Sequence, residues 1–378
     1  MINVKTALIK VNGGSPRQAI IDLFKAMLEQ RIVDALIVPQ EVPSRRMVVP
    51  TLVVSSDGLA SAIPFAPVAI INAARAVSRL TATDPGFKVG AILRPCEIRA
   101  LVEIAKLRQA TLERILIIGV DCLGTFEPTD YYHLTETGLD VEAWLAQAAS
   151  SGQVALNGTK VRTACAICNA ISPVGAHLSL HWVGCNVNEE LYLTYDDSAV
   201  NLDDLFEAGI LWPGELPPAR QSLVESLQKQ RREVEEQLCA DFASRVADIN
   251  CLLDELASCM GCHNCRKVCP ICVCRECIFE SNLFEHEPAK YLQWAAASGA
   301  IKLPADTLLY HLTRMHHMAV SCVGCGQCES GCPSKIPLTL LFRTIGKTLQ
   351  DLFTYVPGAN VGEPPPLTTY KEHELEPR

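Results

Sequence analysis

Seven cysteines lie within nineteen residues of the chain, in the stretch CMGCHNCRKVCPICVCREC from 259 to 277. A second run, CVGCGQCESGCP, covers 322 to 333. Both runs fit the pattern C-x2-C-x2-C-x3-C-P, the spacing with which bacterial ferredoxins hold [4Fe-4S] clusters. The candidate ligands are Cys259, Cys262, Cys265 and Cys269 in the first run, and Cys322, Cys325, Cys328 and Cys332 in the second. The sequence therefore predicts two [4Fe-4S] clusters.

The fourth cysteine of each run is expected to bind the cluster of the other run, as in two-cluster ferredoxins. One cluster would then be held by Cys259, Cys262, Cys265 and Cys332, and the other by Cys322, Cys325, Cys328 and Cys269. Gly261, Gly324 and Gly326 suit the close approach of backbone that such a site requires. Zinc is the alternative, because it also takes four thiolates. Two full copies of the run with its trailing proline would be an unusual design for zinc.

Four further cysteines in the first half of the chain form a third candidate site. Cys96, in LRPCEIRAL, follows a predicted strand and opens a helix, and Cys122, in IIGVDCLGT, ends the next predicted strand. Cys165 and Cys168 add a C-x2-C pair. Because the carboxyl ends of parallel strands lie at one edge of a sheet, these thiols are expected to meet there around a third [4Fe-4S] cluster. The alternatives are a thiol stabilised at a helix N-terminus for Cys96, and zinc or packing for the pair.

The remaining cysteines and a group of histidines carry weaker signals. Cys272, Cys274 and Cys277 extend the first run, and they fit spare ligands, a further metal site or buried small side chains equally well. The isolated cysteines are predicted to pack in the interior, and the histidines before the second run are assigned no role. The first set is Cys185, Cys239 and Cys251, and the second is His311, His316 and His317.

The elements that must position these residues alternate between strands and helices in the first third of the chain. Strands are predicted at 6–11, 33–40, 47–56, 88–93 and 114–122, and helices at 15–30, 67–80 and 96–110. This order predicts an α/β fold with a mostly parallel sheet covered by helices. Gly13 and Gly14 follow the first strand, and Ser15 is the expected N-cap of the first helix. Such a turn can receive a phosphate group.

A change in pattern near residue 217 predicts a domain boundary. The domains expected are an α/β domain over 1–217, a helical two-cluster ferredoxin-like domain over 218–350, and an extended tail over 351–378. One long or two consecutive amphipathic helices should lead into the first cysteine run. A helical connector should join the two runs, and its last helix should begin at Pro304. Residues 187–216 show no clear period.

Composition excludes several classes of protein. The chain has 378 residues, which is enough for two or three domains. Its 18 cysteines lie in runs spaced for metal ligation rather than as a disulfide framework. A net charge of -9 without a basic block argues against nucleic acid as a partner. The N-terminus does not resemble a signal peptide, and no apolar run is long enough to span a membrane, so a reducing cytoplasm is expected.

Four segments, taken in order, resemble the beta subunits of deazaflavin (coenzyme F420)-reducing hydrogenases and formate dehydrogenases. They are GGSPRQAIIDLFKAMLEQRIVDALIV, LRPCEIRAL, IIGVDCLGT and CAICNAISP. The runs CPICVCREC and CVGCGQCESGCPSKIPL resemble the ferredoxin part of the formate dehydrogenase branch. The resemblance covers most of residues 12 to 340. It implies FAD near Gly13, Gly14 and Ser15, and a cluster beside the flavin that is held by Cys96, Cys122, Cys165 and Cys168.

The chain departs from this family after the C-x2-C pair. The family has an Ala-Asp pair and a glycine pattern there, whereas this chain reads VGAHLSLHWVGCN with His177 in the Asp position. The departure bears on flavin contacts and on the use of a deazaflavin, and leaves the cluster ligands untouched.

The resemblance implies an iron–sulfur flavoprotein subunit that moves electrons between a formate dehydrogenase or hydrogenase and a second acceptor. Its partners would be the catalytic subunit and another electron-transfer protein, such as a heterodisulfide-reductase-like subunit. The flavin would convert between two-electron and one-electron transfer. A flavin-free relay between partners and a stand-alone deazaflavin reductase are the alternatives. The sequence does not distinguish a deazaflavin from a nicotinamide as the carrier.

Overall fold

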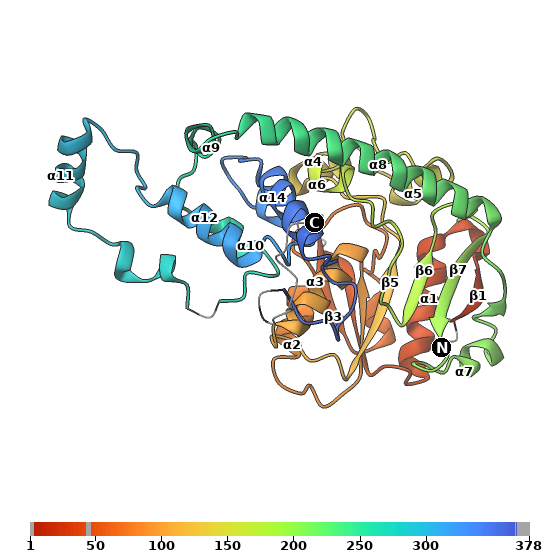
Figure 1. The fold of residues 1–378 in the computed structure, drawn as a ribbon. Helices are drawn as coiled ribbons and strands as arrows, with labels where there is room; N and C mark the ends of the chain where they lie inside the picture. The colour runs from red at the N-terminus through yellow and green to blue at the C-terminus, as the bar shows by residue number, and fades with distance from the viewer. Residues whose placement is uncertain (1–3, 43–46, 275, 367, 369–378) are drawn as a thin grey trace.

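A computed structural model describes residues 4–42, 47–274, 276–366 and 368. Its centre is one sheet of eight strands in the order β3-β2-β4-β5-β6-β7-β1-β8 (Figure 1). The strands are β1 (Val4–Lys10), β2 (Ala35–Val42), β3 (Met47–Val53), β4 (Val89–Leu93), β5 (Ile115–Val120), β6 (Leu178–His181), β7 (Glu190–Asp196) and β8 (Trp212–Pro213).

The centre of the sheet is parallel, as predicted, and its flanks are antiparallel. Strands β2, β4, β5 and β6 run parallel to one another. All residues of β4 and β5 are buried, as expected for parallel strands covered on both faces. Strand β3 pairs antiparallel with β2, because the few residues between them cannot make the crossover that a parallel pair requires. At the other flank, β6, β7, β1 and β8 pair antiparallel in turn.

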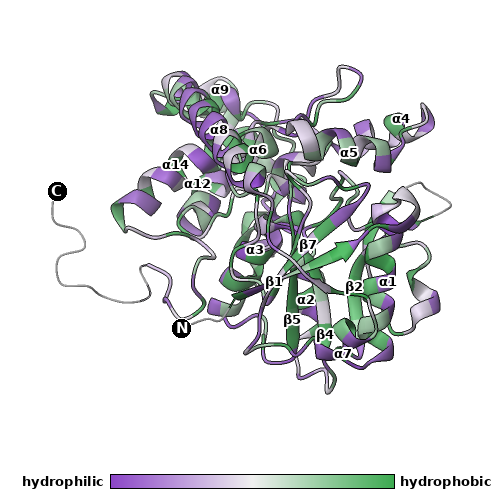
Figure 2. Cartoon of the chain, turned by 90° about the vertical axis from the view of Figure 1, so that its right-hand side faces the viewer, coloured by the Kyte–Doolittle hydropathy of each residue, from purple (hydrophilic) through white to green (hydrophobic). Residues whose placement is uncertain are grey.

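Helices cover both faces of this sheet. Helix α1 (Pro16–Glu29) packs on one face, where Ile20, Phe24 and Met27 join one hydrophobic core. Helices α2 (Ala74–Leu80) and α3 (Pro95–Lys106) pack on the other face. The helix predicted over 67–80 therefore begins only at Ala74. The strands are the most apolar part of the fold, whereas the long helix α8 is mostly hydrophilic (Figure 2).

Helix α8 (Pro218–Arg245) and α9 (Ile249–Glu255) confirm the long helices predicted before the first cysteine run. In Figure 1, α8 lies across the top of the sheet part. Its buried face carries charged side chains as well as apolar ones, and these are Arg220, Arg231 and Glu235. Shorter helices of the sheet part are α4 (Pro128–Glu136), α5 (Val141–Ser151), α6 (Thr163–Ala166) and α7 (Asp203–Glu207).

The two cysteine runs lie among the C-terminal helices. These are α10 (Asn264–Val268), α11 (Pro288–Ser298), α12 (Thr307–Met318), α13 (Gln327–Ser330) and α14 (Leu338–Leu352). The sequence predicts that the last helix of the connector begins at Pro304, and helix α12 begins three residues later, at Thr307. Residues 278–306, which we call the arm, extend away from the rest of the molecule with α11 at their far end (Figure 1). The connector is therefore only partly helical.

The segment after α14 returns to the sheet part. Tyr355 is buried, and its hydroxyl donates a hydrogen bond to Glu103 of α3 at 2.6 Å. The Gly358 amide donates to the same carboxylate at 2.8 Å. The tail predicted over 351–378 thus begins with an anchored stretch, and residues 367 and 369–378 lie outside the described part. Within the described residues, no helix combines the length and apolarity needed to cross a membrane.

Candidate electron-transfer site

Cysteines from the two runs share one small cavity. It is lined by Cys259, Cys262 and Cys265 of the first run together with Cys332 of the second. Cys265 interacts electrostatically with both Cys259 and Cys332. This is the group of four that the ferredoxin spacing predicts. Ligation of a cluster by these thiols stays a prediction.

Cys269 joins the other three cysteines of the second run. It is an electrostatic neighbour of Cys322, Cys325 and Cys328. Burial raises the pKa of the Cys325 thiol to about 12 and that of Cys328 well above its ordinary value. A free thiol here is therefore neutral, and iron must displace the proton to bind.

Glycines allow the second run to approach its neighbours closely. Gly324 and Gly326 have φ values of 69° and 71°, which favour glycine. A Cβ at Gly326 would lie 2.3 Å from the Cβ of Ala164, the residue before Cys165. The second run is thus seated directly against the loop of the third candidate site. Gly261 is also constrained, because a Cβ there would lie 2.7 Å from Pro304.

The structure also brings together the four cysteines of the sheet part. Cys96 is an electrostatic neighbour of Cys122 and Cys168, and Cys122 of Cys165 and Cys168. Cys96 lies in the first turn of α3, and Cys122 follows β5, as expected. Cys96 also interacts with Cys325 of the second run. The three groups therefore follow one another from the arm to the sheet.

Cys165 differs electrostatically from its neighbours. Burial alone would raise its pKa, but the Arg162 guanidinium and hydrogen bonds from Thr125 outweigh burial and bring that pKa below its ordinary value. The Thr125 amide lies 3.4 Å from the sulfur, and Arg162 Nη2 lies 3.6 Å from it. By contrast, burial raises the pKa of Cys122 to about 12. Cys165 is thus better prepared to ionise than Cys96 or Cys122.

Arginines lie beside all three groups of cysteines, and the sequence reasoning missed them. Arg162 and Arg314 are buried, and the other two arginines are half-buried. Arg162 is close to Cys96, Cys165 and Cys325. Arg314, on α12, is close to Cys265, Cys269 and Cys328. Arg99 and Arg343 each interact with both Cys168 and Cys322.

Some nitrogens of these arginines are buried without a partner among the described residues, namely Arg162 Nε and Arg314 Nε and Nη1. Buried donors normally have acceptors. An anionic iron–sulfur cluster would supply them, so the donor set fits the predicted clusters. Arg162 and Arg99 each lie three residues from one of these cysteines, Cys165 and Cys96, whereas Arg314 and Arg343 lie far along the chain from the cysteines that they approach. No spacing pattern in the sequence marks these arginines.

A single zinc ion fits these groups less well. Within the described residues, no three His, Cys, Asp or Glu side chains are close enough together to hold one metal ion. Four thiolates bound to one zinc need such a group. Around a [4Fe-4S] cluster each thiolate binds its own iron atom, so the sulfurs lie further apart.

The other cysteines are distributed as follows. Cys185 and Cys239 are buried, as predicted for packing, and Cys251 is half-buried. Cys272 and Cys277 pack beside the core around the first run, whereas Cys274 is exposed. Burial raises the pKa of Cys272 to about 12.

One of the histidines left without a role, His311, lines the cavity of the first cysteine group. Both of its ring nitrogens are buried without a described partner. Burial lowers its pKa to about 4, so the ring is neutral.

The Gly13–Ser15 turn has the predicted backbone but an unexpected partner. Gly13 and Gly14 have φ values of 68° and 73°, and no atom lies within 4 Å of a Cβ added to either. Ser15 caps α1 by accepting a hydrogen bond from Gln18 N. Its hydroxyl also donates to the Glu142 carboxylate at 2.7 Å. The open glycine turn fits a phosphate group, whereas the carboxylate on Ser15 opposes one at that hydroxyl.

The glycine turn lies at the same end of the sheet as Cys96 and Cys122, because each follows the carboxyl end of a strand. Strand β1 is antiparallel to β7, which is antiparallel to β6, so β1 runs in the direction of β4 and β5. Three strand spacings separate β1 from β5, a distance of about 14 Å at ~4.8 Å each. A ligand the size of a dinucleotide can span that gap.

His177 has a structural role. Its Nδ1 accepts a hydrogen bond from the Ile117 amide at 2.9 Å, and its own amide donates to the Ile117 carbonyl. Burial lowers the pKa of this histidine. The histidine that replaces the family's Asp at this position therefore forms hydrogen bonds with the backbone of β5 and stabilises that strand.

A buried ionic network joins α8 to the strand ends beside Cys122. Arg220 donates to both carboxylate oxygens of Asp121, at 2.5 and 2.9 Å, and His181 Nδ1 lies 3.2 Å from the same group. Further along α8, Arg231 donates to the carbonyls of Leu123 and Cys168. Helix α8 thus holds the segments that carry Cys122 and Cys168, whereas Cys96 lies on α3.

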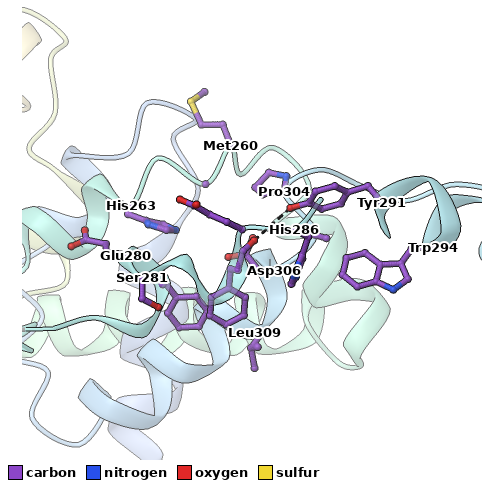
Figure 3. A pocket seen from close by; sticks show the side chains of 15 residues that line it. Met260, His263, Glu280, Ser281, His286, Tyr291, Trp294, Pro304, Asp306 and Leu309 are labelled. Carbon is purple, nitrogen blue, oxygen red and sulfur yellow. Dashed lines mark hydrogen bonds between the residues drawn. The ribbon is translucent and has the colours of Figure 1, made fainter. Parts of the chain in front are cut away.

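A cavity of about 580 Å³ lies between the first cysteine run and the arm. Aromatic rings line it, including His263, His286, Tyr291 and Trp294 (Figure 3). His263 stacks on Tyr310 with ring centroids 4.4 Å apart. The sequence contained no motif for this cavity.

Comparison with known proteins identifies curated relatives, and two of them match nearly the whole chain as follows. The F420-dependent formate dehydrogenase subunit beta of Methanocaldococcus jannaschii is 23% identical over 92% of this chain and 93% of the relative. The F420-dependent formate dehydrogenase 1 subunit beta of Methanococcus maripaludis is 25% identical over 92% of each. No family model matches the chain.

Among solved structures, a chain of the F420-reducing [NiFe] hydrogenase complex from Methanosarcina barkeri aligns with a TM-score of 0.45 and 14% identity. The alignment covers 65% of this chain and 94% of the other. The predicted resemblance to formate dehydrogenase beta subunits is confirmed by the two curated relatives, and their names agree with the prediction of an oxidoreductase subunit.

Proposed function

We propose that this chain, a relative of formate dehydrogenase beta subunits, is an iron–sulfur electron-transfer subunit. It would connect a catalytic formate dehydrogenase or hydrogenase subunit to a second redox acceptor. The observation that carries the proposal is the arrangement of twelve cysteines in three neighbouring groups of four. Each group has the ligand number of a [4Fe-4S] cluster. Eighteen cysteines without a disulfide are consistent with a reducing compartment such as the cytoplasm.

The residues of the chain would hold three clusters in sequence. The first cluster would use Cys259, Cys262, Cys265 and Cys332, the second Cys269, Cys322, Cys325 and Cys328, and the third Cys96, Cys122, Cys165 and Cys168. The arginines between the groups place fixed positive charge beside sites that become more negative on reduction. Most of these cysteines are half-buried, which would limit the access of water to the clusters. Both effects tune reduction potentials.

FAD at the edge of the sheet is the finer part of the proposal. When bound, FAD would exchange a hydride with a soluble carrier and pass single electrons to the neighbouring cluster. The amides of Gly13 and Gly14 would receive its phosphates at the start of α1. The Ser15 hydroxyl would not bind the phosphates, because it already donates a hydrogen bond to the Glu142 carboxylate. The phosphates would therefore be bound by the glycine amides alone.

The contact between Ser15 and Glu142 favours one alternative, a relay that carries clusters but no flavin. In that case the sheet part would serve as a scaffold for the third cluster. A stand-alone reductase is supported less well, because both curated relatives are named as subunits.

The arm is the proposed contact for the catalytic partner. Its apolar side chains Leu283, Leu292 and Leu303 are 60%, 71% and 62% exposed. Cys262, in the neighbouring group, is exposed as well. Exposed apolar patches next to a redox site suit a subunit interface, because a partner both buries them and brings its own cofactor near. The other partner would be an electron-transfer protein of the heterodisulfide-reductase type.

The test is the cofactor content of the full chain purified without oxygen. About twelve iron atoms per chain are expected, at four per cluster, together with one FAD. Iron without flavin would indicate the relay. About eight iron atoms per chain would indicate that the third cluster is absent. Stoichiometric zinc with little iron would overturn the proposal. The full chain is required, because a fragment ending at residue 217 lacks Arg220, the partner of Asp121.

Paired glycine variants test the flavin position. Gly13→Asn is expected to lower the FAD content several-fold without changing the iron content, because asparagine tolerates positive φ but its side chain fills the open turn. Gly86→Asn is the matched control, since Gly86 also has positive φ and no atom within 4 Å of an added Cβ. Equal FAD content in both variants would contradict a flavin phosphate at Gly13.

A further inference from the structure

A cationic cavity lies where α2 meets the loop that follows α10. Its volume is about 410 Å³, within the range of small-ligand sites. The polar residues that line it are Arg75, Ser78, Arg79, Gln109, Arg266 and Lys267. The loop of Pro270 and residues 272–274 forms its remaining wall. Two segments that are distant in the sequence therefore build one concave surface.

The charge of this cavity is largely uncompensated. It has four basic side chains and, among its described lining residues, no carboxylate. Arg266 is paired with Glu280 at 2.6 Å. Arg75 has only carbonyl partners in the described part of the chain, those of Lys267 at 2.5 Å and Cys269 at 2.9 Å. For Arg79 and Lys267 the described residues provide no ion pair.

The buried part of the cavity is held in place, whereas its rim can adapt. Hydrogen bonds to two carbonyls fix Arg75, and a bond of 3.0 Å to the Cys274 carbonyl fixes Arg266. Arg266 Nε is buried and lacks a partner among the described residues. Arg79 and Lys267 are exposed and can move onto a ligand. Fixed guanidinium groups with free donors recognise phosphate in a bidentate manner.

We propose that this cavity binds the phosphate groups of a small, nucleotide-sized ligand. The site is separate from the Gly13 turn and does not depend on FAD binding there. Its concave shape and its volume favour a small molecule over the flat surface of an acidic protein. The net charge of -9 opposes a nucleic acid. Because Arg75 contacts the Cys269 carbonyl, the ligand would lie beside the second group of cysteines.

Calorimetric titration of the anaerobically purified full chain tests the proposal, with pyrophosphate and ADP as probes. Saturable binding at one site per chain is expected, and it should weaken as salt rises. The variant Arg79→Gln/Lys267→Gln should bind at least ~10-fold more weakly, since it removes two charge-assisted hydrogen bonds to phosphate. Arg232→Gln, which removes an exposed cation from α8, is the matched control and should bind as the unaltered chain does.

Each outcome supports or contradicts the binding of phosphate in this cavity. Tighter binding of ADP than of pyrophosphate would support a nucleotide, and equal binding would support recognition of the phosphates alone. Absence of saturable binding by both probes would overturn the proposal. Unchanged affinity in the double variant would do so too, as would binding of poly-glutamate but not of pyrophosphate. Iron content measured in each variant shows whether the neighbouring cysteine groups are intact.

Discussion

A buried arginine lies beside each of the three cysteine groups in this protein. Arg314 stands beside the first and second groups, and Arg162 beside the second and third. A guanidinium stays charged at any ordinary pH, so it cannot escape burial by losing its proton. A buried charge without a counter-charge is costly. The arginines therefore indicate that negative charge resides in these groups in the mature protein.

The exchange of fourth cysteines can be tested one residue at a time. Cys332→Ala is expected to lose about four iron atoms, and the lost cluster should be the one that Cys259→Ala also loses. The reason is that Cys332 lines the cavity of Cys259, Cys262 and Cys265. Electron paramagnetic resonance of the reduced variants identifies the missing cluster. If Cys332→Ala instead matched Cys322→Ala, each run would hold its own cluster.

At the residue scale the sequence could predict the cysteines but not their surroundings. The C-x2-C-x2-C-x3-C-P spacing is local, because one loop wraps one corner of a cluster. Arg314 contacts the carbonyl of Cys265 from a different helix, and Arg343 lies near Cys168 through the packing of α14. Such contacts arise only when the elements are packed. The same applies to Glu142, whose approach to Ser15 no local pattern indicates.

Helix α8 is the element that ties the cysteine-rich part to the sheet. Arg220, Arg231 and Glu235 lie on its buried face, and each has a partner on another element. The Glu235 carboxylate pairs with Arg343 of α14. The buried charged side chains of α8 need partners at matching positions. The helix can therefore pack favourably only where those partners lie. The ionic contacts thus specify position as well as contributing stability.

Removal of one partner of the Asp121 network should destabilise the protein strongly. Arg220→Met is expected to cost about 3–5 kcal/mol, since it leaves a buried carboxylate with fewer compensating charges. Arg232→Met, an exposed substitution on the same helix, should change stability by less than about 0.5 kcal/mol. Anaerobic urea unfolding followed by circular dichroism measures both. Similar midpoints for the two variants would show that Arg220 contributes little.

At the element scale the sequence predicted most strands and helices of the first third but not the order of the sheet. Alternation of apolar strands with amphipathic helices reflects a local period. The pairing of β1 between β7 and β8 depends on contacts across the whole chain. Strands β7 and β8 fall in the region 187–216, where no period was visible. Strand β8 has only two residues at the edge of the sheet, and burial along β7 does not alternate strictly, so neither strand leaves a clear pattern.

Across the whole molecule, the three cysteine groups run from the arm to the edge of the sheet. One end lies near the exposed apolar side chains of the arm, and the other lies at the same end of the sheet as the open Gly13–Gly14 turn. An electron relay requires such separation, because its donor and acceptor must reach different ends. The cationic cavity beside Cys269 lies along the middle of this path.

The proposed partner contact can be tested at the same scale. Leu283→Ser/Leu292→Ser should leave iron content and thermal stability unchanged, since both side chains are exposed. Recovery of the catalytic subunit in affinity purification from the native host should fall at least ~10-fold. Val174→Ser is the matched control, because Val174 is 68% exposed but lies on the sheet part. Full recovery with the double variant would exclude these leucines from the interface.

The exchange of cysteines between the two runs also constrains how the protein can mature. Because Cys332 lines the cavity of the first run and Cys269 lies with the second, the first group is complete only after residue 332 has been synthesised and the second only after residue 328. A chain interrupted within the arm would therefore lack both complete groups rather than one. If these groups bind the proposed clusters, iron would be delivered late in synthesis or after release. Until then, the nascent chain exposes open thiols that the assembly machinery of the cell has to protect from oxidation.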